Sequence, residues 1–290
     1  MHNSIRTPLN QLDYFALLIA DEKRLPLLEA LASIAKITYP NLKLALIDNE
    51  FDFLAQRICS KVPADASALQ KIWFLSHFLY EELQLRSIAN VKESPDFSCI
   101  NKVLRDRIGT DYILAAIYLE LAHVLKLKAK GVIFPGRFLI KVCFCRNNHM
   151  PVEVIIDPQT GLSLSMKKLH DLLSPYKENH GLIDEFDIPM DLFLEAATQK
   201  ELLACVLNDL RDACLEEENW PNLTQTLDYL IVLNPRDLEN YRERGFALLR
   251  QGLKHKAETD LEYYLQHAPR QSTYDFDYVT QQLQALRDTP

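Results

Sequence analysis

Apolar positions in the first part of the chain recur at helical spacing. Residues 25–35 carry an apolar stripe that ends before Pro40, and residues 66–85 repeat the pattern. A polar stretch at 90–98 then interrupts it. Apolar side chains three and four residues apart share one face of a helix, so the pattern predicts amphipathic helices from about residue 9 to 90.

A more hydrophobic helix is predicted over residues 112–126. Gly109 breaks the preceding pattern, Thr110 can cap the helix, and Asp111 supplies an acidic first turn. The residues that follow are apolar on nearly every side, which is typical of a helix surrounded by other elements. We therefore expect this helix at the centre of its domain.

After this helix the period changes to that of β-strands. Short β-branched segments lie at 131–134, 138–144 and 152–156, with a turn expected at 146–149. Side chains alternate across the middle strand, so one face should carry Lys141, Cys143 and Cys145, and the other Ile140, Val142 and Phe144. A helix followed by antiparallel strands predicts the α+β class.

From about Asp191 onward the helical pattern returns, together with a repeat. Pro235 and Pro269 are 34 residues apart, and the apolar pattern before the first proline recurs before the second. This is the period of tetratricopeptide repeats, in which each unit is a pair of antiparallel helices. The predicted helices cover residues 196–216, 220–233, 236–252, 254–267 and 274–287.

Charge is unevenly distributed along the 290 residues, which carry a net charge of -8. Residues 191–240 alone sum to -8, whereas residues 101–150 sum to +6. The two segments could dock on each other, meet different partners, or be solvated helix faces. The overall acidity argues against non-specific nucleic-acid binding, and no glycine-rich phosphate-binding motif occurs.

The N-terminal region has no signal-type pattern. The apolar run at 14–20 is far shorter than the roughly 20 residues that span a bilayer. We therefore expect a cytoplasmic protein that does not bind membranes. In that reducing compartment its six cysteines are best interpreted as small buried hydrophobic residues.

Several motifs occur in an order that resembles a known family. They are Phe74-Leu-Ser-His-Phe-Leu-Tyr-Glu-Glu-Leu83, Cys99-Ile-Asn-Lys-Val-Leu-Arg-Asp-Arg-Ile-Gly109, Ile117-Tyr-Leu-Glu-Leu-Ala122, Gly131-Val-Ile-Phe-Pro-Gly-Arg-Phe-Leu139 and Ile156-Asp-Pro158. From about residue 20 to 270 the chain is similar to bacterial SirB-type proteins. The resemblance implies a transglutaminase-like, papain-like core with a small antiparallel sheet, followed by an all-α repeat segment. We assign residues 1–188 to the first domain and 189–290 to the second.

The same resemblance indicates that the catalytic triad is degenerate. Active transglutaminase-like enzymes place a cysteine at the start of the core helix, a histidine on the next strand and an aspartate on the strand after it. The matching positions here are Asp111, Arg137 and Asp157, and no cysteine lies within ten residues of position 111. The family usually has a proline-containing stretch at the first position, so it resembles a group that has already lost its nucleophile.

A carboxylate cannot replace a thiolate nucleophile, and an arginine that stays protonated cannot act as a general base. We therefore expect a pseudoenzyme without cofactor or metal. We also expect Arg137 and Asp157 to form a salt bridge where a catalytic dyad once lay.

An enzyme with a relocated nucleophile is the alternative. Cys143 or Cys99, paired with His123 or His149, would give a cysteine-dependent hydrolase or acyl transferase. Cys143 and Cys145 beside His149 lack the further ligands of a zinc site, so structural cysteines are the simpler interpretation.

Residues Glu120 and His123 form half of a carboxylate-bridged di-iron motif. The sequence has no second Glu-x-x-His, so a buried polar pair is the simpler interpretation.

The repeat segment offers candidate binding residues. Tyr241, Arg242, Arg244 and Arg250 fall on the first helix of the second unit, which usually faces the concave side of such repeats. Trp220 and the other tyrosines are expected to pack between helices. These positions predict a protein or peptide partner, and a regulatory or interaction role for the chain; the sequence leaves its oligomeric state open.

Overall fold

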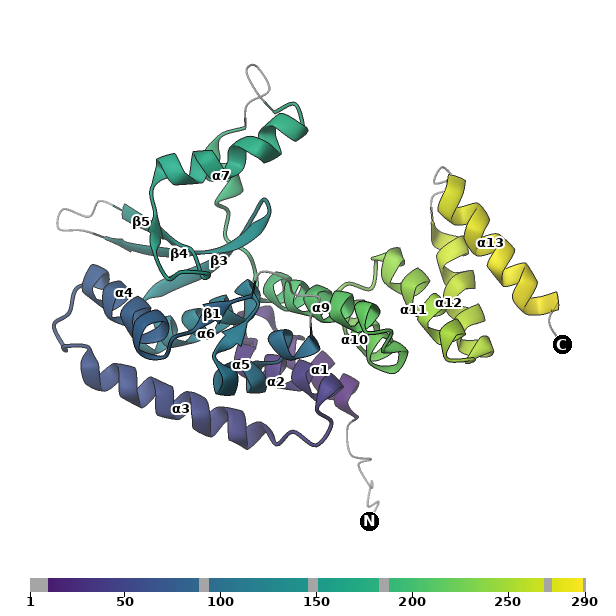
Figure 1. Cartoon of the computed structure of the whole chain (residues 1–290), viewed down its shortest axis with the longest axis horizontal. Helices are drawn as coiled ribbons and strands as arrows, with labels where there is room; N and C mark the ends of the chain where they lie inside the picture. Colours follow the sequence, from purple (N-terminus) through teal and green to yellow (C-terminus); the bar gives the residue numbers. More distant parts are fainter. Residues whose placement is uncertain (1–9, 89–93, 146–150, 183–187, 269–272, 289–290) are drawn as a thin grey trace, which may run out of the picture.

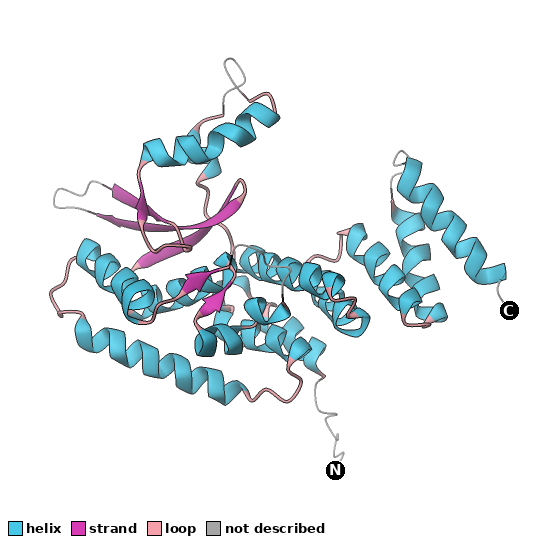
Figure 2. Ribbon diagram, viewed as in Figure 1, coloured by secondary structure: helices cyan, strands magenta, loops and turns pink. Residues whose placement is uncertain are grey.

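The structure is a computed structural model (Figure 1, Figure 2). It describes residues 10–88, 94–145, 151–182, 188–268 and 273–288.

Helices form the N-terminal part, as predicted. They are α1 (Gln11–Leu18), η1 (Glu22–Arg24), α2 (Leu27–Thr38), α3 (Leu44–Lys61), α4 (Ala68–Ser76) and η2 (His77–Glu82). Ser67 caps α4 in a reciprocal capping box with Gln70. The predicted helix over 66–85 therefore starts at Ala68, but η2 has wider π-helical winding, which the apolar pattern does not distinguish from an α-helix.

The hydrophobic helix predicted at 112–126 is α6 (Asp111–Val124), and it lies at the centre of the core. Every residue from Ile113 to Tyr118 is fully buried, which explains why no polar face appears in its sequence. Before it come η4 (Pro95–Ser98), α5 (Ile100–Asp106), and a parallel pair of two-residue strands, β1 (Arg86–Ser87) and β2 (Ile108–Gly109).

A four-stranded antiparallel sheet packs on α6. In spatial order its strands are β3 (Lys128–Phe134), β4 (Arg137–Cys145), β5 (Pro151–Ile156) and β6 (Ser163–Leu164). The predicted alternation along β4 is confirmed, because Ile140 and Val142 are buried while Lys141 and Cys143 are only half-buried. The turn predicted at 146–149 lies outside the described residues.

The other face of the sheet is covered by α7 (Met166–Asn179) and α8 (Met190–Phe193) (Figure 1). Leu169 and Leu173 of α7 form a second hydrophobic cluster with Val132 and Leu139 of the sheet. The sheet is therefore enclosed between α6 and α7, and its strand ends carry the site described below.

Five helices complete the chain, close to the predicted bounds. They are α9 (Gln199–Glu216), α10 (Trp220–Leu233), α11 (Leu238–Arg250), α12 (Lys254–His267) and α13 (Thr273–Asp288). Figure 1 shows α9 and α10 beside the core, and α11, α12 and α13 leading away from it towards the C-terminus. The α+β class with a C-terminal helical repeat region is confirmed. None of the helices in the described ranges is long and apolar enough to cross a membrane.

The first repeat hairpin, α9–α10, shares the hydrophobic core of the N-terminal domain. Tyr229 of α10 packs its ring 4.5 Å from that of Phe15, and Leu203 and Val206 of α9 are fully buried in the same cluster. The boundary at residue 189 stays a prediction, but the packing of side chains is continuous across it.

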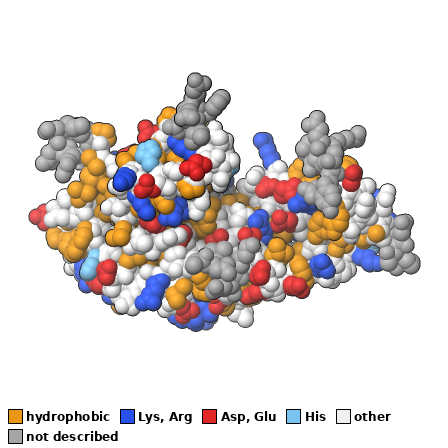
Figure 3. Space-filling view, turned by 45° about the horizontal axis from the view of Figure 1, so that its top comes forward, with side chains coloured by type: hydrophobic (Ala, Val, Ile, Leu, Met, Phe, Trp, Pro, Cys, Tyr) orange, Lys and Arg blue, Asp and Glu red, His pale blue; other side chains and the backbone are white. Residues whose placement is uncertain are grey.

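The basic segment 101–150 and the acidic segment 191–240 contact each other through apolar side chains. The acidic segment includes α9, which packs on α6 and η4. Among the residues that the structure describes, no ion pair joins 101–145 to 191–240. Both signs of charge lie side by side on the face shown in Figure 3.

Candidate functional site

The first triad position lies at the N-terminus of the core helix, as the resemblance implies. Asp111 begins α6, directly after its N-cap Thr110. One carboxylate oxygen accepts a hydrogen bond from the hydroxyl of Ser87 on β1, and the other accepts one from Nε2 of Gln159 at 2.8 Å. A helix N-terminus stabilises an anion, and here that anion is a carboxylate instead of a thiolate.

The second and third positions form the expected salt bridge. Nη1 of Arg137, the first residue of β4, lies 3.3 Å from Oδ2 of Asp157, which follows β5. Asp157 is nearly buried, and burial raises the pKa of its carboxyl group. The backbone N–H of Gln159, which donates to Oδ1 at 2.9 Å, and the charge of Arg137 both oppose that rise in pKa.

Gln159 links the first triad position to the third, although the sequence analysis did not single it out. Its backbone binds Asp157 and its side-chain amide binds Asp111. A signal was present, because an aspartate often accepts a hydrogen bond from the backbone two residues later. The turn is held by Tyr80, whose hydroxyl donates to the carbonyl of Pro158 at 2.7 Å.

The turn after Asp157 requires glycine at position 161. Gly161 has a φ of +71°, and a Cβ there would lie 2.1 Å from the ring of Tyr80. Two constraints therefore coincide at one residue, and both keep Asp157 and Gln159 in place.

Several cysteines have thiols that are hard to ionise. Burial raises the pKa of Cys99 and of Cys214 to about 12, and that of Cys205 to about 11. Burial also raises the pKa of Cys143, whose Sγ is 3.6 Å from Oε1 of Glu153. Few of these thiols are thiolates at neutral pH. No hydrogen bond between described residues joins Cys99 or Cys143 to a histidine, and His149 lies outside the described residues.

The half motif Glu120–His123 lies near the end of α6. Burial raises the pKa of Glu120, and the neighbouring charge of His123 opposes this. Both residues line a surface pocket of about 760 Å³ between α6, β3 and the start of α9. Within the described ranges, no three His, Cys, Asp or Glu side chains are grouped as metal ligands.

Residue Asp209 of α9 carries an unusual carboxyl group at the contact with α6. Burial raises its pKa to about 7, and the charges of Asp212 and Asp111 act in the same direction. The neighbouring side chain of Thr110 works against this rise. We therefore expect the stability of this contact between α9 and α6 to depend on pH.

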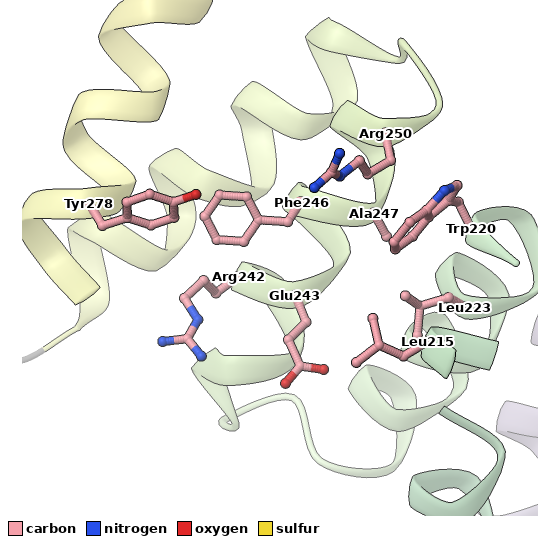
Figure 4. A pocket seen from close by; sticks show the side chains of 9 residues that line it. All are labelled: Leu215, Trp220, Leu223, Arg242, Glu243, Phe246, Ala247, Arg250 and Tyr278. Carbon is pink, nitrogen blue, oxygen red and sulfur yellow. The ribbon is translucent and has the colours of Figure 1, made fainter. Parts of the chain in front are cut away.

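A groove of about 450 Å³ lies among the repeat helices (Figure 4). It is lined by side chains from α9, α10, α11 and α13: Leu215, Trp220, Leu223, Arg242, Glu243, Phe246, Ala247, Arg250 and Tyr278. The guanidinium of Arg250 lies 5.6 Å from the ring centroid of Trp220. The rings of Phe246 and Tyr278 are also 5.6 Å apart.

Two of the four predicted binding residues, Arg242 and Arg250, line this groove. The other two are used in packing. Arg244 of α11 binds Asp260 of α12 through two hydrogen bonds of 2.7 Å, and Asp228 of α10 through one of 2.6 Å.

Tyr241 packs its ring 4.4 Å from that of Tyr263. Trp220, Phe246 and Tyr278 of the groove were not singled out as binding residues. Arg242, Phe246 and Arg250 recur every four residues, and this spacing could have indicated a shared face.

The fold agrees with the comparison to known proteins. The profile of the transglutaminase-like superfamily matches residues 46–208, more than half of the chain, and the chain belongs to this superfamily. A tetratricopeptide-repeat profile matches residues 210–284.

The relatives include proteins of the SirB type. A UPF0162 protein of Xylella fastidiosa is 27% identical over 268 residues, covering 91% of both chains. Protein SirB1 of Salmonella typhimurium is 27% identical over 217 residues, covering 74% of this chain and 76% of that protein.

A crystal structure of menin aligns with 96% of this chain and 72% of its own, but at 10% identity and a TM-score of 0.40 the likeness is too slight to support an inference.

Proposed function

We propose that this protein is a non-catalytic interaction or regulatory protein, in which the transglutaminase-like core is a scaffold for the repeat helices. The observation that carries the proposal is the ion pair between Arg137 and Asp157, beside a carboxylate at position 111. Acyl transfer needs a nucleophile and a base that exchanges a proton with it. Asp111 is engaged by two hydrogen-bond donors, and the guanidinium of an arginine cannot act as a general base.

The groove among α9, α10, α11 and α13 is the proposed binding site for a protein or peptide. Tetratricopeptide repeats generally mediate protein–protein interactions, and this groove combines aromatic, aliphatic and arginine side chains. Such side chains contribute much of the binding energy at interfaces. No cofactor is needed for this role. We place the protein in the cytoplasm, where its free thiols, two of them exposed, stay reduced.

Alkylation of the native protein near pH 7 tests the absence of a catalytic thiol. We expect the exposed Cys59 and Cys145 to react no faster than the thiol of glutathione, and the buried cysteines to react only on unfolding. A single cysteine that reacts far faster than glutathione in the folded protein would favour the cysteine-dependent hydrolase or acyl transferase instead.

Partner capture tests the groove. Cross-linked partners of the full chain should be lost when Arg250 in the groove is changed to Glu. The matched control is Arg236→Glu, which makes the same charge change at an exposed residue outside the groove lining. If the wild type, Arg250→Glu and Arg236→Glu all captured the same partners equally well, this result would contradict the proposed site.

A further inference from the structure

The groove contains a regular stripe of charged and aromatic side chains. Arg242, Phe246 and Arg250 occupy positions i, i+4 and i+8 of α11, and all three line the groove. Figure 4 shows them along the side of α11 that borders the groove, with Tyr278 of α13 reaching towards Phe246. The helical rise of about 1.5 Å per residue separates the two arginines by about 12 Å along the helix.

The charge of the stripe is positive. Among the described residues, no carboxylate forms an ion pair with Arg250, whose guanidinium lies over Trp220. Nη2 of Arg242 lies 2.6 Å from Glu239, whose side chain is 52% exposed. The side chain of Arg242 is itself 21% exposed, and its guanidinium lies 5.8 Å from the ring centroid of Tyr264, so a ligand carboxylate would have to compete with Glu239 for this arginine.

The acidic residue Glu243, which also lines the groove, is compensated. Its Oε2 lies 3.6 Å from Arg211 of α9, and burial raises the pKa of its carboxyl group. Arg242 and Arg250 are therefore the two cations that line the groove along α11. Exposed carboxylates at Glu216–Glu218 lie between Leu215 and Trp220 in the chain, so from the α9–α10 side they oppose the attraction of Arg250 for an anion.

Apolar surface lies open between the arginines. Tyr278 is 46% exposed and Leu215 51% exposed, although both line the groove. An aromatic or large aliphatic ligand side chain placed beside Phe246 would remove this surface from water, and this burial would add to the charge contacts.

We propose that the groove binds a short extended peptide segment with two acidic residues four positions apart and a large apolar residue between them. This rests on the proposed function and names the class of ligand. An extended chain advances about 3.3 Å per residue, so carboxylates at positions i and i+4 are about 13 Å apart, close to the roughly 12 Å that separates Arg242 and Arg250 along the helix. Each guanidinium can bind a carboxylate through two N–H donors.

Tryptophan fluorescence provides a direct readout. The chain has two tryptophans, and Trp73 is 58% exposed on α4, so Trp73→Phe leaves only Trp220 in the groove to report. In this background the full chain is titrated with the peptide Gly-Glu-Ser-Phe-Ser-Glu-Gly. Three comparison peptides carry Lys for both Glu, Ala for Phe, or the two Glu side by side.

The first peptide should bind at least about tenfold more tightly than the Lys peptide and about threefold more tightly than the other two, because it alone meets both arginines and the apolar surface. Its affinity should fall as salt is raised, since the contacts are between charged groups. Arg250→Glu should weaken it about tenfold or more and improve binding of the Lys peptide, while Arg236→Glu should change neither by more than about twofold.

The inference is overturned if the Lys peptide binds as well as the Glu peptide, if Arg250→Glu leaves the Glu peptide unaffected, or if none of the peptides binds. These results would leave the proposed function standing, because that is decided by thiol reactivity and by partner capture. Circular dichroism and the melting temperature of each variant show whether a loss of binding is a loss of fold.

Discussion

At position 137 the chain has a guanidinium where the resemblance places a histidine, and its partner is the retained aspartate. Asp157 has few ways to be stabilised apart from Arg137 and the backbone of Gln159, because its side chain is only 9% exposed. In the proposed pseudoenzyme, the arginine therefore takes the place of a general base and, in addition, neutralises the aspartate that would have oriented it.

Replacing Arg137 should destabilise the core. Arg137→Met leaves the carboxylate of Asp157 without its cation, so we expect a loss of about 1–2 kcal/mol of unfolding free energy at pH 7. Asp157→Asn in the same background should recover part of this loss. Urea denaturation of the wild type, both single variants and the double variant measures the coupling, and a coupling near zero would contradict a stabilising pair.

The carboxyl group of Asp209 should make stability depend on pH. Burial raises its folded-state pKa to about 7, so the folded state holds a proton that the unfolded state loses at lower pH. Its contribution to stability is complete below the unfolded-state pKa and is lost as the pH rises towards and through about 7.

Asp209→Asn removes this dependence. Relative to the wild type it should be stabilised by on the order of 2 kcal/mol at pH 8 and little changed near pH 4. Melting temperatures of both proteins from pH 4 to 8 check this. Parallel pH profiles would show that Asp209 does not titrate in this range.

Among the elements, those with complete local signals were predicted best. Residues 220–233 were predicted as a helix and α10 has those bounds, because Asn219 caps its start and Pro235 follows its end. The π-helical winding of η2 was not predicted, because the apolar pattern in the sequence does not distinguish a π-helix from an α-helix.

The roles of Arg244 and Gln159 were also missed. The partners of Arg244 lie 16 residues away on either side, in other helices, and Gln159 binds a residue 48 positions before it. The sequence indicates which residues share a face of one element. It does not give the register between elements, on which these contacts depend.

Two glycines in turns provide a matched comparison. Gly136 and Gly161 both have positive φ values, +76° and +71°, but only Gly161 has a neighbouring ring where a Cβ would lie. Gly136→Ala should cost about 1–2 kcal/mol for the backbone alone. Gly161→Ala should cost clearly more, because Tyr80 must move and loses its hydrogen bond to Pro158. Equal losses in chemical denaturation would mean that the turn relaxes away from Tyr80.

Replacing Arg244 should loosen the second repeat unit. Arg244→Gln leaves Asp260, which is only 5% exposed, without its bidentate partner, so we expect a loss of about 2–4 kcal/mol. Arg250→Gln, on the same helix but exposed, should change stability by less than about 0.5 kcal/mol. Hydrogen exchange of the backbone amides in α11 and α12 measures the local loss of stability. Equal protection of these amides in Arg244→Gln and Arg250→Gln would contradict the predicted role of Arg244.

For the whole molecule, the important feature is that the hairpin α9–α10 belongs to the core. Leu203, Val206, Leu207 and Leu210 of α9 are fully buried, in a cluster that includes α1, α2 and α6. The two domains predicted from the sequence therefore share one hydrophobic core up to α10, and independent folding is expected only for what lies beyond it.

Truncation tests this division. A chain that ends at residue 235 keeps the main cluster nearly whole and should unfold in one cooperative thermal transition. A chain that ends at residue 195 loses α9 and α10, exposes the apolar surface of α2 and α6, and should aggregate or melt without cooperativity. A sharp melting transition for the shorter chain would instead support separate folding at the predicted boundary.

The shared hairpin also limits how such a protein can be rebuilt by recombination. The two family profiles meet between residues 208 and 210, in the middle of α9, so a genetic exchange at that point would cut a helix buried against the core. A genetic exchange after the end of α10 would cut no helix in either of the two recombinant proteins. Repeats downstream of that helix are therefore the part of this architecture that evolution, or a protein engineer, can most readily lengthen or replace.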